Sequence, residues 1–149
     1  YLHQQGVRLR VIGERSHFAP DIQKMMAECE ALTANNTRLS LSVAVNFGGR
    51  WDIVNAARQM AQKVADGELQ PAQVDEEAFA SALSLSGLPE PDLLIRTGGD
   101  YRISNFLLWD LAYTELFFTD LFWPDFDAAA LQEAVATYAQ RTRRFGGRK

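Results

Sequence analysis

The spacing of apolar residues along the chain predicts short strands that alternate with helices. The strand-like runs cover residues 7–13, 39–47, 92–96 and 115–119. Residues with helical spacing follow Pro20, the Gly48-Gly49 pair, Asp75 and Asp127. This alternation predicts an α/β fold, with a mostly parallel sheet of about four strands and helices on both faces of that sheet.

The same pattern predicts which side chains are buried. The strand at 92–96 is expected to be buried on both faces, because residues 93–95 are all apolar. Residues 104–109 are expected to form a short helix. In the last helix Leu131, Val135 and Tyr138 are expected to face the core.

Composition narrows the class of protein. The chain has 149 residues, which favours one domain, and its 47% hydrophobic and 23% charged residues are typical of a globular protein. The net charge of −4 argues against a general nucleic-acid binder. The single cysteine, Cys29, cannot form an intrachain disulfide, which fits a reducing compartment.

Residues 1–5 resemble the last turn of a helix, so we expect further residues before Tyr1.

Two predicted strands end in a similar way, with a polar residue shortly before a pair of glycines. One end reads Asn46-Phe47-Gly48-Gly49 and the other reads Arg96-Thr97-Gly98-Gly99. In open α/β sheets, ligands bind beyond the carboxyl ends of the strands. Paired glycines allow the backbone to approach a ligand, and N–H groups at the start of a following helix can bind an anion. We therefore expect an anion site at this edge.

The second glycine pair is flanked by side chains suited to phosphate. Arg96 and Arg102 can make forked contacts with phosphate oxygens, and Ser104 can donate a hydrogen bond. Two arginines and a hydroxyl within nine residues match a diphosphate better than a single carboxylate. In the alternative interpretation the two arginines only form ion pairs with a nearby aspartate. The candidates for that role are Asp92, Asp100 and Asp110.

Glu115 is the candidate metal ligand. It opens the fourth predicted strand and is expected at the same sheet edge as the arginines. A carboxylate beside a diphosphate often holds Mg²⁺, which prefers oxygen ligands. The alternative is an ordinary carboxylate at a strand end. Asp52 fits stabilisation of a helix dipole better than metal binding, and His3 and His17 are isolated.

Several segments together resemble the cis-prenyltransferase family, and most of all its bacterial undecaprenyl diphosphate synthases. The segments are residues 46–52, 94–109, 113–120, 123–126 and 143–147. The longest reads Leu-Ile-Arg-Thr-Gly-Gly-Asp-Tyr-Arg-Ile-Ser-Asn-Phe-Leu-Leu-Trp. The resemblance extends from the second strand to the end of the chain, so residues 1–149 are expected to be the carboxyl-terminal portion of a single domain of this family.

The resemblance implies a function. Such enzymes condense isopentenyl diphosphate onto an allylic diphosphate, here expected to be farnesyl diphosphate, with cis double bonds; the expected product is undecaprenyl diphosphate. It also implies a homodimer in the cytoplasm, with peripheral membrane contact through the lipid product. By resemblance, the diphosphate of isopentenyl diphosphate is expected to contact Arg96, Arg102 and Ser104, and Mg²⁺ is expected to contact Glu115. Asn46 and Arg50 are expected in the neighbouring part of the site. Arg144 and Gly146 are expected to reach the active site of the partner subunit.

The chain departs from the family pattern in two ways. Asp100-Tyr101 stands where the family usually has Glu-His, so the role of that histidine does not transfer to Tyr101. The motif Asp-Gly-Asn-Gly-Arg-Trp, which supplies the catalytic aspartate, does not occur in residues 1–149. We expect the catalytic aspartate upstream of Tyr1, and we expect this chain alone to be inactive.

Two alternative functions remain open from the sequence. One is a non-catalytic partner subunit of the same fold; retention of Arg96, Arg102, Ser104 and Glu115 argues against it. The other is an unrelated α/β module that binds a nucleotide or sugar phosphate. No Gly-x-Gly-x-x-Gly or Walker-type loop supports that alternative.

Overall fold

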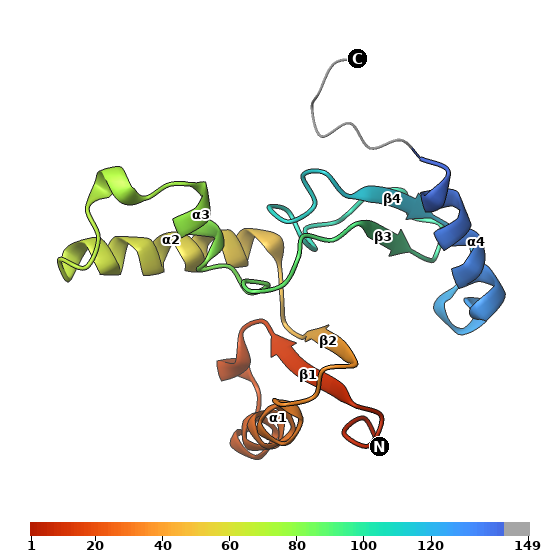
Figure 1. Ribbon diagram of the computed structural model, residues 1–149, viewed down its shortest axis with the longest axis horizontal. Coiled ribbons are helices and arrows are strands. Elements are labelled where there is room, and N and C mark those ends of the chain that lie inside the picture. Colours follow the sequence, from red (N-terminus) through yellow and green to blue (C-terminus); the bar gives the residue numbers. More distant parts are fainter. Residues whose placement is uncertain (142–149) are drawn as a thin grey trace. The chain divides into compact units, whose positions relative to one another are not determined.

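The computed structural model describes residues 1–141. The chain divides into two compact units, residues 1–87 and residues 88–149. Figure 1 shows the elements of each unit. The first unit contains β1, α1, β2, α2 and α3, and the second contains β3, β4 and α4.

The first unit is built on a parallel pair of strands. Its elements are β1 (Val7–Ile12), α1 (Pro20–Thr33), β2 (Leu39–Ala44), α2 (Gly49–Ala65) and α3 (Glu76–Ala80). β1 pairs in parallel with β2, with Val7 opposite Leu39. Pro20 begins α1 at a position where a missing N–H has no consequence. The strands and helices predicted for this unit are present, but β1 and β2 end at Ile12 and Ala44, before the predicted ends at residues 13 and 47.

Helix α1 packs against β1 (Figure 1). Two of its side chains accept hydrogen bonds from backbone N–H groups at the free edge of that strand. The Leu9 N–H donates to Thr33 Oγ1 at 3.0 Å, and the Val11 N–H donates to Glu30 Oε1 at 2.7 Å. Arg15 donates to both carboxylate oxygens of Glu30, at 2.7 and 2.8 Å. The unpaired N–H and C=O groups of a strand edge can pair with another chain, so these hydrogen bonds make such pairing at the edge of β1 less favourable.

Glu30 should make the stability of the chain depend on acid pH. Burial alone would raise the pKa of Glu30, but the hydrogen bonds from Arg15 and Val11 lower it below its ordinary value of 4.5. A carboxyl with a lowered folded pKa stabilises the fold above its unfolded pKa, and this stabilisation is lost as the pH falls through the folded pKa. Glu30→Gln should therefore lower the free energy of unfolding at pH 7 by about 2 kcal/mol. It should also flatten the decline of stability below pH 4.5 in chemical denaturation.

Glu28→Gln is the matched control for Glu30→Gln. Glu28 is on the same helix, but its pair with Lys24 is long, at 3.8 Å, and both side chains are mostly exposed. Exposed pairs of this kind contribute about 0–1 kcal/mol. Equal pH profiles for the two variants would contradict the role assigned to Glu30.

Asp52 links the first turn of α2 to the segment after α3. Its side chain is only 2% exposed, and Oδ1 accepts from the Ser84 hydroxyl at 2.6 Å and from the Ser84 N–H at 3.0 Å. A buried carboxylate needs such partners. The arrangement agrees with a structural role for Asp52 and not with metal binding.

The second unit contains β3 (Leu93–Arg96), β4 (Glu115–Phe118) and α4 (Ala128–Ala139). β3 pairs in parallel with β4, with Leu93 opposite Glu115. Asp127 begins α4, since its carboxylate accepts from the Ala130 N–H at 2.9 Å. The α/β class with parallel strands is confirmed; within residues 1–141 the strands are hydrogen-bonded as the pairs β1–β2 and β3–β4.

Residues 104–109 do not form the predicted helix. They form turns and bends, and Ser104 and Asn105 have φ values of 47° and 61°. Two successive residues in the left-handed region cannot continue a right-handed helix. The apolar spacing in this segment therefore reflects a folded loop.

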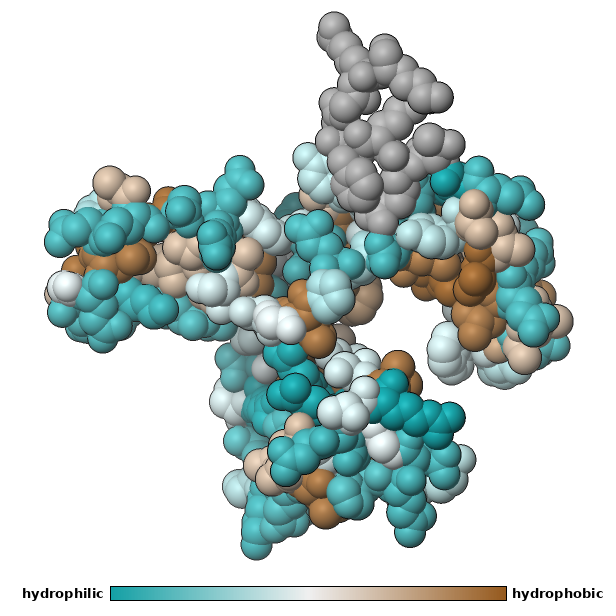
Figure 2. Space-filling view, in the orientation of Figure 1, coloured by the Kyte–Doolittle hydropathy of each residue, from teal (hydrophilic) through white to brown (hydrophobic). Residues whose placement is uncertain are grey.

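Burial is lower than the sequence predicted. In β3 only Leu94 is buried, and its neighbours Leu93 and Ile95 are half-buried. On α4 the buried residue is Ala134, whereas Leu131 and Val135 are 47% and 51% exposed. Figure 2 shows apolar surface over α4 accordingly. Within residues 1–141, no helix is both long and apolar enough to cross a membrane.

Candidate functional site

The carboxyl end of β3 leads into a cluster of cationic and hydroxyl groups, here called the cationic cluster: Arg96, Arg102 and Ser104. Ser104 Oγ accepts from Arg96 Nη1 at 2.8 Å and from Arg102 Nε at 3.2 Å. Arg96 also donates to the carbonyl of Arg102. The structure therefore brings together the residues that the sequence assigned to a diphosphate.

Asp100 joins the cluster as its internal counter-ion. Its Oδ2 lies 3.0 Å from a guanidinium nitrogen of Arg96 and 3.0 Å from one of Arg102. The pairing with an aspartate that the sequence left open is thus confirmed for Asp100. Exposed ion pairs contribute only about 0–1 kcal/mol, and the side chains of Arg102 and Asp100 are 66% and 44% exposed. An incoming anion of higher charge could therefore take the place of this carboxylate.

The glycine pair after β3 has a different role from the one predicted. The Gly98 N–H donates to the Leu121 carbonyl at 2.8 Å, and the Gly99 N–H donates to the Thr119 carbonyl at 3.0 Å. These donors attach the loop to the segment after β4. Since no helix begins at residue 104, an anion here would be bound by side chains and not by a helix amino terminus.

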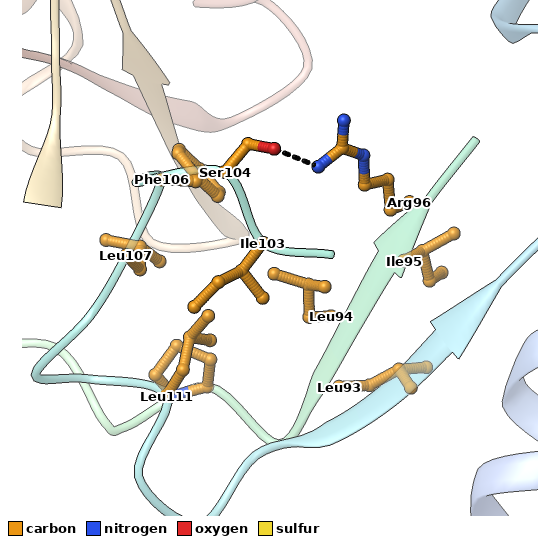
Figure 3. Close-up of a pocket in the computed structure, with 10 residues that line it drawn as sticks. Leu93, Leu94, Ile95, Arg96, Ile103, Ser104, Phe106, Leu107 and Leu111 are labelled. Atoms are coloured by element: carbon orange, nitrogen blue, oxygen red, sulfur yellow. Dashed lines mark hydrogen bonds between the residues drawn. The ribbon is translucent and has the colours of Figure 1, made fainter. Parts of the chain in front are cut away.

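An apolar pocket of about 450 Å³ lies beside the cationic cluster. Leu94, Ile103, Leu107 and Leu111 lie close together in it, with the hydrogen-bonded Arg96 and Ser104 at one end (Figure 3). Small-molecule sites typically have volumes of about 300–1,000 Å³, with apolar walls and a few polar groups that fix orientation. The pocket therefore suits a small apolar group that carries an anionic head.

Glu115 does not lie at the predicted edge. In the parallel pair it is opposite Leu93, whereas Arg96 is opposite Phe118. Three residues of strand separate these positions by roughly 10 Å along the sheet. Glu115 instead accepts from Arg141 at 2.6 Å. A residue that opens a parallel strand belongs to the amino edge of the sheet, so the predicted common edge with the arginines is wrong.

The other predicted site residues fall in different parts of the chain. Asn46 and Arg50 are exposed residues of the first unit, at the end of β2 and in the first turn of α2. Asn46 has a φ of 44° and donates to the Glu14 carbonyl at 3.1 Å. Arg144 and Gly146 lie outside the described residues.

The donor set limits the kind of metal site that is possible. Within residues 1–141, no group of three or more His, Cys, Asp or Glu residues is arranged to hold a metal ion. Mg²⁺, however, commonly uses one or two carboxylates together with substrate phosphates and water. Glu115 carries the carboxylate that the sequence assigned to this role, and here it is paired with Arg141 at 2.6 Å.

A family model described as "Putative undecaprenyl diphosphate synthase" matches residues 1–146. The chain belongs to this cis-prenyltransferase family. It is 58% identical, over 97% of its length, to the ditrans,polycis-undecaprenyl-diphosphate synthase ((2E,6E)-farnesyl-diphosphate specific) of Xanthomonas campestris. It is 53% identical to the protein of the same name from Escherichia coli strain K12. The chain spans 56% and 58% of the lengths of these relatives.

Two solved structures resemble the chain as well. Lavandulyl diphosphate synthase from Lavandula x intermedia, solved in complex with dimethylallyl diphosphate, matches with a TM-score of 0.91 and 42% identity. A "probable undecaprenyl diphosphate synthase" from Campylobacter jejuni matches with a TM-score of 0.82 and 29% identity. Each match covers 96% of this chain, and 61% and 64% of the respective structures.

Two contacts in this cis-prenyltransferase chain were not predicted from its sequence. Tyr101 donates to Asp120 Oδ1 at 2.7 Å, and Arg141 pairs with Glu115. Both join residues about twenty or more positions apart, so no local spacing could have indicated them. The bond to Asp120 raises the pKa of Tyr101 above its ordinary value of 10.

Proposed function

We propose that this chain contributes the isopentenyl diphosphate site of a polyprenyl diphosphate synthase. In this proposal the cationic cluster binds the diphosphate, and the neighbouring apolar pocket receives the five-carbon group. The observation that carries the proposal is that Arg96 and Ser104 lie at one end of that pocket and that Arg102 joins them through its hydrogen bond to Ser104. Membership of the cis-prenyltransferase family supports the same substrate class.

The reaction proposed for the whole protein is the condensation of isopentenyl diphosphate onto an allylic diphosphate. The names of its relatives support farnesyl diphosphate as the allylic substrate and undecaprenyl diphosphate as the product. The arginines would hold the isopentenyl diphosphate through the reaction, since their guanidinium groups keep their charge at every physiological pH. The absence of turnover from these 149 residues alone stays a prediction.

Mg²⁺ is the proposed cofactor, with Glu115 as one ligand. When bound, it would stabilise the charge that develops on a departing diphosphate. Arg141 lies on the Glu115 carboxylate at 2.6 Å, so binding of the ion at this residue requires the guanidinium to move away. Asn46 and Arg50 are proposed to shape the neighbouring part of the site, and Arg144 and Gly146 to reach the site of a partner subunit.

We also propose a homodimer in the cytoplasm that contacts the membrane through its lipid product. Support for a subunit interface comes from large exposed aromatic residues after β4. Phe122 and Trp123 are 66% and 76% exposed, and the ring of Trp123 stacks on Phe126 at 6.3 Å. Aromatic residues are enriched in the cores of protein–protein interfaces.

Isothermal titration of the chain with isopentenyl diphosphate, ATP and NAD tests the proposed substrate. Isopentenyl diphosphate should bind, because its small apolar group fits the pocket beside the cluster. ATP and NAD should bind at least about tenfold more weakly, because the side chains that line the pocket beyond Arg96 and Ser104 are apolar and offer no partner for a base or ribose. Equal affinity for the three ligands would contradict the proposal and favour a general phosphate site.

A further inference from the structure

We infer that Tyr101 is a positioning residue, which holds the cationic cluster in its binding geometry by fastening the loop of residues 97–105 to the segment after β4. The inference rests on the proposed function, since it assigns Tyr101 a role in diphosphate binding. It concerns a side chain that stands where the family usually has histidine, and it gives that side chain a different role.

The first support is the contact of Tyr101 itself. Its hydroxyl donates to Asp120 Oδ1 at 2.7 Å, a hydrogen bond to a charged acceptor. Its ring lies 5.6 Å from the ring of Phe118, with a tilt of 44°. The side chain is therefore fixed both at its ring and at its hydroxyl to the end of β4.

The second support is the backbone around this contact. The N–H groups of Gly98 and Gly99 donate to the carbonyls of Leu121 and Thr119, which flank Asp120. A Cβ on Gly99 would lie 3.4 Å from Asp120 Oδ1, which is van der Waals contact, so the backbone of the loop passes close to this carboxylate. The Tyr101–Asp120 bond thus completes a continuous attachment between the two segments.

The third support is the position of Tyr101 within the cluster. It lies between Asp100 and Arg102 in the chain, and the carbonyl of Arg102 accepts from Arg96. A shift of the Tyr101 backbone would therefore move Arg102 and the carbonyl that orients Arg96. Fixing Tyr101 restricts these guanidinium groups before the ligand arrives, which lowers the cost of ordering them on binding.

The exposure of Tyr101 argues that this contact serves the site more than the stability of the fold. Its side chain is 64% exposed, so its ring buries little apolar surface. Tyr101→Phe keeps the ring beside Phe118 and removes only the hydroxyl. The variant should leave the thermal midpoint within about 2 °C of the parent chain.

The experiment combines amide hydrogen exchange with titration of inorganic pyrophosphate. In Tyr101→Phe we expect exchange at Gly98 and Gly99 to become about fivefold faster. We expect the pyrophosphate Kd to rise about fivefold, which corresponds to about 1 kcal/mol. Tyr1→Phe, the same change at a residue that is 88% exposed in the other unit, is the control and should change neither quantity.

Variants of Asp120 distinguish the effect of the Tyr101–Asp120 hydrogen bond from a general effect on the loop of residues 97–105. Asp120→Ala removes the acceptor and should match Tyr101→Phe, and the double variant should be no weaker than either single variant. Asp120→Asn keeps an oxygen acceptor and should retain most of the affinity for pyrophosphate. Losses that add in the double variant would overturn the inference.

The outcomes distinguish this inference from the proposed function. If Arg96→Ala abolishes pyrophosphate binding while Tyr101→Phe leaves the Kd unchanged, the proposed function stands and the positioning role is wrong. If the parent chain does not bind pyrophosphate, the proposed function fails and the positioning role fails with it. If Tyr101→Phe lowers the thermal midpoint as well as the affinity, Tyr101 is a structural residue and the inference is overturned.

Discussion

Arg96→Ala is expected to weaken the binding of isopentenyl diphosphate by about 10–100-fold. Arg96 is the least exposed charged group of the cationic cluster, at 25% for its side chain, and it contacts Ser104, Asp100 and the Arg102 carbonyl. A hydrogen bond to a charged group contributes about 1.5–3 kcal/mol, which corresponds to this range of affinity. Isothermal titration at fixed ionic strength measures the change.

Two further variants make the Arg96 result specific. Arg96→Lys keeps the charge but loses the forked donor geometry, so its affinity should lie between the parent chain and Arg96→Ala. Arg58→Ala removes the same charge from an exposed position on α2 and should leave the Kd within about twofold of the parent chain. If Arg58→Ala weakened binding as much as Arg96→Ala, the effect would be one of net charge and not of the cluster.

Gly13→Ala is expected to cause a large loss of stability in the first unit. Gly13 follows β1 with a φ of 122°, and an added Cβ would lie 1.8 Å from the Val45 carbonyl oxygen. The left-handed backbone and the displacement of neighbouring backbone together should cost about 2–5 kcal/mol. Thermal unfolding followed by circular dichroism should show a midpoint at least about 10 °C lower.

Gly67→Ala is the matched control, because it has the same chemistry without the steric clash. Gly67 has a φ of 76°, and nothing lies within 4 Å of an added Cβ. Its cost should be limited to the backbone conformation, about 1–2 kcal/mol. Equal losses for the two variants would show that the close approach of Gly13 to Val45 has no energetic consequence.

The elements of the fold were largely predictable from local pattern. The alternation of apolar residues in β1 and β2 depends only on neighbours along the chain, as do the proline that begins α1 and the aspartate that caps α4. The prediction of a helix at residues 104–109 was wrong for a local reason, which the spacing of apolar residues does not reveal. Ser104 and Asn105 adopt left-handed conformations, which the apolar residues after them do not indicate.

The site was predictable in part. Arg96, Arg102 and Ser104 follow one strand closely, so their convergence could be inferred from sequence. The ion-pair partners of the arginines and of Glu115 could not be inferred from sequence. Asp100 was one of several candidate partners for the arginines, and Arg141 is 26 residues from Glu115. The placement of Glu115 was wrong for a simpler reason: in a parallel pair the first residue of a strand lies at the amino edge.

A crystal structure of the chain with isopentenyl diphosphate would test the central claim most directly. The account predicts diphosphate oxygens within about 3.2 Å of the Arg96 and Arg102 guanidinium nitrogens and of Ser104 Oγ, with the Asp100 carboxylate displaced from both arginines. It also predicts the five-carbon group in the pocket that contains Leu94 and Leu107. A bound diphosphate elsewhere, with Asp100 still paired to both arginines, would contradict the account.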